Sequence, residues 1–94
     1  MKFEWDESKN KINIFKHDVS FEDASTVFED DYAVKWFDEE HSEDEDRFIV
    51  VGMNEKLIEL TVCYCYRGEN DDIIRIISAR KATKNEIKMY ERGI

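Results

Sequence analysis

Alternation of apolar and polar side chains predicts β-structure through the second half of the chain. Four segments have strand character: 32–37, 47–53, 57–67 and 73–79. The segment 57–67 shows the alternation most clearly. One of its faces would carry Ile58, Leu60, Val62, Tyr64 and Tyr66, and the other Glu59, Thr61, Cys63 and Cys65. The segment 73–79 is apolar on both faces, as a central strand would be. Turn-forming residues at 53–56 and 68–72 predict short connections and therefore an antiparallel meander.

A short strand and a capped helix are expected at the start of the chain. Residues 3–5 have strand character, and Asp6 can then accept hydrogen bonds from the free N–H groups of the next turn. The spacing of apolar residues predicts a helix over 7–17, with Ile12 and Phe15 facing inward.

Capping signals predict two further helices. Ser20 with Asp23 resembles a capping box and opens a short helix. The acids at 29–31 should end it, because negative charge is unfavourable at a helix C-terminus. Thr83 with Glu86 is a second capping box. The helix after it would run over 84–92, with Ile87, Tyr90 and Ile94 facing inward and Gly93 at its end.

The expected order is therefore β-α-α-β-β-β-β-α in a single domain spanning residues 1–94. This order predicts an α+β fold in which an antiparallel sheet packs against helices on one face. With three Gly, no Pro, no repeat and no linker, the chain offers no boundary for a second domain.

Composition indicates a small soluble intracellular protein, which we expect in the cytoplasm. The chain is 41% hydrophobic and 39% charged, enough for one core and too apolar for a disordered chain. Two Cys are too few for a disulfide scaffold. No apolar stretch approaches the roughly 18 residues of a membrane span, and the first residues lack an apolar signal region.

The net charge of −9 comes from 23 acids against 14 Lys and Arg, and at face value it argues against nucleic acid as a partner. The average hides a division. Residues 1–46 carry 16 acids and five Lys or Arg, whereas residues 47–94 carry seven acids and nine Lys or Arg. We therefore expect a local cationic cleft on an acidic body, which would bind a nucleic acid weakly through few phosphate contacts.

Two conspicuous features have plain interpretations. Cys63-x-Cys65 lacks the second pair that zinc sites use, and a bridge between cysteines two apart in a strand would be strained, so free thiols are expected. The acidic run 38–46 lacks the glycine and spacing of a calcium loop and is more typical of an exposed loop. The sequence predicts no metal and no cofactor.

Histidine, lysine and arginine residues carry the candidate chemistry. Lys16 and His17 end the first helix, where the dipole favours cations, and a role beside a phosphate is the alternative. His41 lies in the acidic run, where carboxylates favour its charged form. Arg75 interrupts an apolar strand, so it must be paired or open into a cleft. The arginines suit a phosphate, and they equally suit structural ion pairs with the many acids.

Three segments resemble the BrnT family of type II toxins, which pair with BrnA antitoxins. They are FEWDESKNKINIFKHDVSFEDASTVFED, HSEDEDRF and RIISARKATKNEIKMYE, and with the strands between them they cover nearly the whole chain. The opening FEWD, the segment KH-x-VSFE-x-A-x-x-VF and R-x-ISAR-x-A recur in that family. Asp18 departs from the family, which usually has Gly there, and it adds a negative charge and restricts the turn.

The resemblance implies a ribonuclease toxin with a RelE-like fold that inhibits translation by cutting RNA without a metal. It also implies a BrnA-like antitoxin as partner, expected as a heterotetramer of two toxins on an antitoxin dimer, with DNA contacted only through the antitoxin. No membrane partner is expected. The alternative is a catalytically inactive binding module that holds such an antitoxin.

RNA cleavage without a metal needs a base for the 2′-hydroxyl, cations for the charge on the transition state and an acid for the leaving 5′ oxygen. The candidates for proton transfer and phosphate stabilisation are His17, His41, Arg47, Arg67, Arg75 and Arg80. The candidates for holding the RNA backbone are Lys16, Lys81 and Lys84. Base and acid stay unassigned, because a sequence contains no distances.

Overall fold

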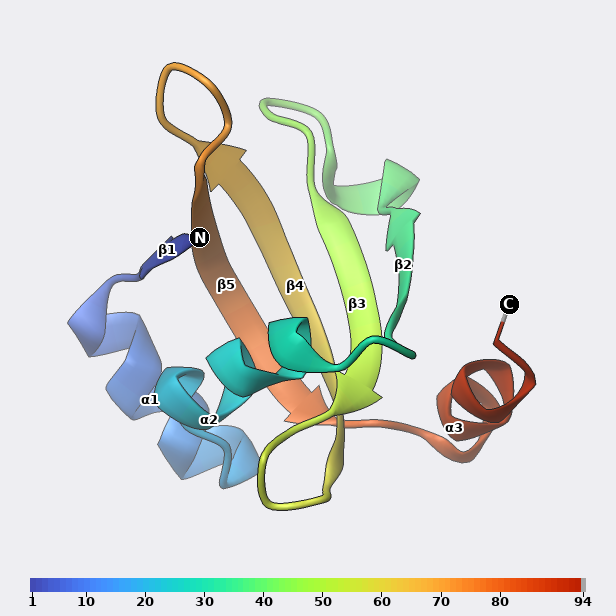
Figure 1. Ribbon diagram of the computed structural model, residues 1–94. Helices are drawn as coiled ribbons and strands as arrows, with labels where there is room; N and C mark the ends of the chain where they lie inside the picture. Colours follow the sequence, from blue (N-terminus) through green and yellow to red (C-terminus); the bar gives the residue numbers. More distant parts are fainter. Residues whose placement is uncertain (94) are drawn as a thin grey trace.

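The computed structural model describes residues 1–93, which form a five-stranded sheet, three α-helices and two short 3-10 helices (Figure 1). The elements in chain order are β1 (Lys2–Glu4), α1 (Glu7–His17), α2 (Phe21–Ser25), η1 (Thr26–Glu29), β2 (Val34–Phe37), η2 (Glu39–His41), β3 (Phe48–Met53), β4 (Glu59–Arg67), β5 (Ile73–Lys81) and α3 (Lys84–Arg92). The 3-10 helices η1 and η2 are additions to the expected order. The predicted inner position Ile94 lies outside the described residues.

The sheet is mixed, so the prediction of a wholly antiparallel sheet is wrong. Its strand order is β1-β5-β4-β3-β2, and β1 lies parallel to β5. The four strands β2 to β5 form the expected antiparallel meander. A tight turn imposes antiparallel pairing on strands that follow each other, but two α-helices and three strands separate β1 from β5, so no turn fixes the direction of β1.

The main hydrophobic core lies on one side of the sheet, here called the first face. The helix α2 and the 3-10 helix η1 pack on this face, and α1 lies along the edge of β5 (Figure 1). The buried core residues are Val19, Phe21, Ala24, Val27, Val50, Leu60, Val62, Tyr64, Ile74, Ile76 and Ala79. Strand alternation places Leu60, Val62 and Tyr64 together on the first face, as predicted.

The helix α3 packs against the opposite side, the second face, so the expectation that helices cover one face only is also wrong. Thr61 and Arg80 are cross-strand partners on the second face, and both bond to Glu86 of α3. Figure 1 shows α3 beyond β3, apart from α1 and α2. Only a short link joins the end of β5 to α3. The bonds from Arg80 and Thr61 to Glu86 then hold α3 on the second face.

The helix α1 has the predicted bounds and cap, but it turns a different side inward. Asp6 accepts from the backbone N–H groups of the first turn, as expected. The predicted inner residues Ile12 and Phe15 are 53% and 90% exposed. The buried side chains of α1 are instead Asn10 and Asn13. Apolar spacing therefore mispredicts this helix, because two amides bury themselves through hydrogen bonds rather than by hydrophobic transfer.

Asn13 joins α1 to the edge of β5. Its Nδ2 donates to the carbonyl oxygens of Val19 and Ala79, both at 2.8 Å, and its Oδ1 accepts from the N–H of Ala79 at 3.1 Å. Asn10 is held similarly, with Oδ1 accepting from the N–H of Phe21 at 2.8 Å. These two buried amides are satisfied by partners, so their burial carries little penalty.

The ends of the helices follow local chemistry. Thr83 and Glu86 form the predicted capping box, and Gly93 ends α3 with φ of 72°. Asp18 ends α1 in the left-handed region, with φ of 56° and ψ of 35°. Glycine adopts that conformation most easily, so the turn favours glycine at the position that Asp18 occupies in this chain. No helix within residues 1–93 is long and apolar enough to cross a membrane.

We predict that Asn13→Ala lowers the free energy of unfolding by about 2–3 kcal/mol, because it leaves the buried backbone groups of Ala79 without partners. The matched control on the same helix is Phe15→Ala, which removes a 90% exposed ring and should change stability by less than about 0.5 kcal/mol. Urea unfolding measures both. A larger loss of stability for the Phe15 variant would contradict the arrangement of α1.

Candidate functional site

A cavity of about 240 Å³ opens on the second face, and we call it the central pocket. Its lining residues are Asp38, His41, Arg47, Ile49, Thr61, Cys63, Ile77, Ser78 and Arg80. The register makes Cys63 the neighbour of both Ile49 and Ser78 across the sheet. Neighbouring residues of β3, β4 and β5 therefore line the pocket together with the longer side chains of His41, Arg47 and Arg80.

His41 is oriented by a buried carboxylate. The ring Nδ1 lies 2.9 Å from Oδ2 of Asp38, and Asp38 is only 8% exposed. A carboxylate only accepts hydrogen bonds, so Nδ1 carries the proton in the neutral ring and Nε2 is left with a free lone pair. The 3-10 helix η2 brings the two residues together, because residues three apart lie on the same side of its single turn. This arrangement leaves Nε2 of His41 as the ring nitrogen that can accept a proton.

Arg80 is held by both oxygens of Glu86. Its Nη1 donates to Oε1 at 2.7 Å and its Nη2 to Oε2 at 3.0 Å. The hydroxyl of Thr61 and the N–H of Thr83 also donate to Glu86, each at 2.8 Å. The Arg80 guanidinium, with help from these donors and against the effect of burial, lowers the pKa of Glu86 to about 2. Glu86 therefore stays ionised and fixes Arg80 at the rim of the pocket.

Glu45 joins two further arginines, Arg47, which lines the central pocket, and Arg67, which does not. Nη1 of Arg67 donates to the Glu45 carboxylate at 2.8 Å, and the Arg67 guanidinium lowers the pKa of Glu45. Nε of Arg47 lies 3.5 Å from the same carboxylate, outside hydrogen-bond geometry. That Nε is buried and has no hydrogen-bond partner within residues 1–93. Arg47 is consequently the least satisfied cation of the pocket.

The structure brings together three of the residues predicted for catalysis, His41, Arg47 and Arg80. Arg67 adjoins them through Glu45. Arg75 lies apart, because it pairs with Glu4 of the neighbouring β1 at 2.7 Å and does not line the pocket.

The remaining predicted residues lie elsewhere. Lys16 and His17 line an adjoining cavity of about 200 Å³, here called the α1 groove, between Lys9, Lys16 and His17 on α1 and Ile77 and Ser78 on β5. Lys81 and Lys84 are exposed and line neither cavity. His17 and His41 are thus assigned to two different cavities that meet at Ile77 and Ser78.

Sequence reasoning missed the acids that orient the site. Asp38 stands three residues before His41, but the acidic run around it resembles a solvated loop. Glu86 was fully explained by the capping box with Thr83, and nothing local indicated that it also reaches Arg80. The spacing Asp-x-x-His was the one available signal, and it is too common to be specific.

Cys63 lines this pocket but is poorly suited to act as a nucleophile. Cys63 and Cys65 are free, and burial raises the pKa of Cys63 to about 11, so its thiol stays protonated near neutral pH. Within residues 1–93, no three His, Cys, Asp or Glu side chains converge in a way that could hold a metal ion.

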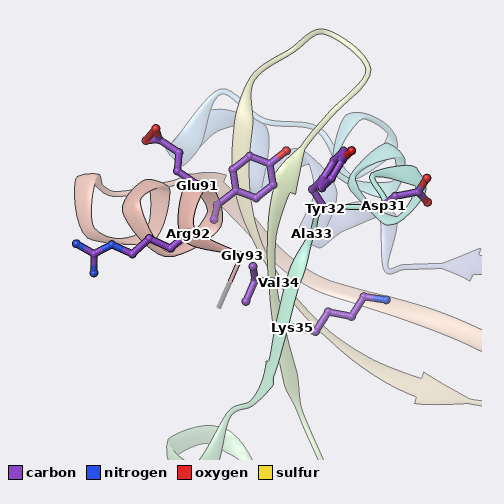
Figure 2. Close-up of a pocket in the computed structure, with 9 residues that line it drawn as sticks. Asp31, Tyr32, Ala33, Val34, Lys35, Glu91, Arg92 and Gly93 are labelled. Atoms are coloured by element: carbon purple, nitrogen blue, oxygen red, sulfur yellow. The ribbon is translucent and has the colours of Figure 1, made fainter.

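A larger cavity of about 630 Å³ lies between β2 and α3. Figure 2 shows Asp31, Tyr32 and Lys35 on one side of it and Glu91 and Arg92 on the other. It holds no histidine, and its acids and cations are equal in number. Tyr90 also lines it, but the hydroxyl donates to Asp30 at 2.7 Å, and this hydrogen bond raises the pKa of Tyr90 to about 12. The central pocket is therefore the better place for proton transfer.

Comparisons with known proteins agree with the sequence motifs. The family model described as "Ribonuclease toxin, BrnT, of type II toxin-antitoxin system" matches residues 5–86. Among solved structures, the chain is similar to the ribonuclease toxin BrnT of Brucella abortus, with 28% identity and a TM-score of 0.66. That match covers 89% of this chain and 99% of the Brucella chain. No curated protein matches.

We predict that Glu86→Gln removes part of the acid sensitivity of the fold. The pKa of Glu86 is depressed from its usual 4.5 to about 2, so its contribution to stability is present above about pH 4.5 and is lost as the pH falls towards 2. Glutamine does not titrate. The variant should be less stable than the wild type near pH 6, and the two urea midpoints should converge as the pH falls.

Glu91→Gln is the control, because Glu91 is exposed on the same helix and forms no ion pair within residues 1–93. Its midpoint should run parallel to that of the wild type across this range. A constant difference between wild type and Glu86→Gln from pH 6 to pH 2 would contradict the assignment.

Proposed function

The chain belongs to the BrnT family of ribonuclease toxins of type II toxin–antitoxin systems, and from this premise we propose that it cleaves RNA in the central pocket. The observation that supports this site most is the pairing of His41 with the buried Asp38 beside Arg47 and Arg80. A proton-transfer group next to two guanidinium groups is the combination that phosphodiester cleavage requires.

The proposed reaction is attack of the ribose 2′-oxygen on the neighbouring phosphorus. The bond from phosphorus to the 2′-oxygen forms, the bond to the 5′-oxygen breaks, and a 2′,3′-cyclic phosphate remains. Nε2 of His41 takes the proton from the 2′-hydroxyl, and the resulting imidazolium gives it to the leaving 5′-oxygen. The positive charge of Arg47 and Arg80 stabilises the charge that gathers on the phosphate oxygens.

We further propose that this reaction needs no metal, because histidine and arginine supply both the proton transfer and the positive charge. His17, Arg67, Arg75, Lys81 and Lys84 are not required for the bond-breaking step in this proposal. Arg75 stabilises the pairing of β1 with β5 through Glu4 instead.

We propose that in the cell the protein is a RelE-like toxin of the cytoplasm that inhibits translation by cutting RNA. Its partner would be a BrnA-like antitoxin, with two toxins held on an antitoxin dimer and with DNA contacted only through the antitoxin. The acidic first half of the chain, with 16 acids against five Lys or Arg in residues 1–46, suits a basic surface on that partner.

A non-catalytic binding module is the second candidate function, and one observation favours it. Each of the four candidate arginines has a carboxylate of the same chain within 4 Å, as structural ion pairs would. In that case the protein would hold the antitoxin without cutting RNA. Cleavage by the purified protein separates the two functions.

We predict that the purified protein cleaves single-stranded RNA in the presence of EDTA and leaves a 2′,3′-cyclic phosphate. His41→Asn should lower kcat by about 100- to 10,000-fold, because it removes the proton-transfer group while keeping a polar side chain of similar size. Lys88→Gln is the control, since Lys88 is exposed on α3 and lines neither the central pocket nor the α1 groove.

Equal cleavage by His41→Asn and the wild type would rule out the central pocket as the site. Cleavage that stops in EDTA and returns with added magnesium would contradict the metal-free mechanism. A wild-type protein that binds the antitoxin but cuts no RNA, in fractions that are folded by circular dichroism, would establish the binding module instead.

A further inference from the structure

The α1 groove and the central pocket meet at β5. Ile77 and Ser78 line both cavities. Lys9, Asn13 and Lys16 lie on one side of α1, because residues spaced by three and four positions share a helix face. Asn13 is bonded to Ala79, so this side of α1 is fixed against β5. A ligand that fills the central pocket and extends past Ser78 therefore enters the α1 groove.

An irregularity in β5 produces this junction. Cys63 pairs with Ser78 and Tyr64 pairs with Ile76, which leaves Ile77 without a partner on β4. Such a bulge inserts one residue and redirects the side chains around it. Ile76 and Ala79 both remain in the core of the first face, while Ile77 and Ser78 between them both line the cavities.

The charges of the α1 groove are available to a ligand. Lys9, Lys16 and His17 are exposed and form no ion pair within residues 1–93. No acidic side chain lines the groove. The arginines of the central pocket differ, since each already faces a carboxylate. The α1 groove thus offers positive charge that no carboxylate within residues 1–93 neutralises.

The other flank of the central pocket has the opposite character. A cavity there is lined by His41 and Arg47 together with four acids, Glu40, Glu43, Asp44 and Glu45. These carboxylates repel phosphate, so an RNA strand is not expected to continue in that direction. The two flanks therefore differ in sign, and only the α1 side attracts the backbone of a polyanion.

We propose that the α1 groove binds the RNA phosphate next to the one that is cleaved, a subsite that rests on the ribonuclease function proposed above. Lys9, Lys16 and His17 contact this phosphate, and Ile12 and Ile77 provide an apolar wall for the attached nucleoside. The strand runs from the central pocket along α1 and away from the acidic loop. His17 is then a binding residue rather than a second proton-transfer group.

The test combines substrate length with a double variant. Lys9→Gln/Lys16→Gln should raise KM about tenfold for a single-stranded RNA that extends beyond the cleaved phosphate on both sides, with kcat unchanged. With a dinucleotide that contains only the cleaved phosphate, the difference from the wild type should disappear. Lys11→Gln/Lys88→Gln removes the same charge from exposed positions outside both cavities and should leave KM near its wild-type value.

Binding gives a second readout that does not depend on cleavage. For a short RNA with 2′-O-methyl riboses, the slope of log K against log salt should become shallower in Lys9→Gln/Lys16→Gln. The expected change is about 0.7 for each lysine that no longer binds a phosphate. The slope should not change in the control pair. If the wild type cuts no RNA, the ribonuclease proposal fails. The salt slope then still tests whether the α1 groove binds an RNA phosphate.

Three results would overturn the subsite. One is an equal slope in the two double variants. Another is an equal rise of KM for the dinucleotide and the longer RNA, which would place the lysines at the cleaved phosphate itself. The third is a fall of kcat rather than a rise of KM for the longer RNA, which would indicate that Lys9 and Lys16 take part in the cleavage step.

Discussion

The pairing of the Asn13 amide with the backbone of Ala79 is the interaction on which the site depends. It occupies the edge of β5 beyond the short β1, where the strand would otherwise have free N–H and C=O groups. It also holds α1 in place without a hydrophobic stripe, since Ile12 and Phe15 remain exposed. The α1 groove has α1 as one wall and β5 as the other, so both walls are set by this one side chain.

Ion pairs explain how an acidic chain can present arginines at a cavity. Glu86 and Glu45 hold the guanidinium groups of Arg80 and Arg67 at fixed positions, and the lowered pKa of each carboxyl keeps both pairs charged. A pair of this kind has no net charge at a distance, so it orients a phosphate better than it attracts one. Long-range attraction must come from unpaired cations, and the net charge of −9 leaves few surfaces where these prevail.

The sequence predicts well those features that depend on neighbours along the chain. The Asp6 cap, the Thr83–Glu86 capping box and the bounds of α3 follow from side chains that bond within one helical turn. It predicts poorly the features whose partners are distant. Asn13 lies 66 residues before Ala79, and no periodicity of apolar residues indicates that an amide, not Ile12 or Phe15, faces the sheet. The parallel pairing of β1 has the same origin.

The candidate site shows the same limit. Sequence reasoning offered His41, Arg47 and Arg80 among six candidates because Arg and His suit a phosphate, and the structure places these three around one pocket. It could not separate them from Arg75, whose partner Glu4 comes from the other end of the chain. Nor could it divide the two histidines, because only the fold assigns His17 to the α1 groove and His41 to the central pocket.

RNA is proposed to bind the second face of the sheet at the central pocket. The most direct measurement is an NMR titration of the 15N-labelled protein with a short 2′-O-methyl RNA, which cannot react through its 2′-oxygen. If RNA binds there, the amide signals of Thr61 and Ser78 and the ring signals of His41 should shift together. Shifts confined to Tyr32, Lys35 and Glu91, around the cavity between β2 and α3, would contradict it.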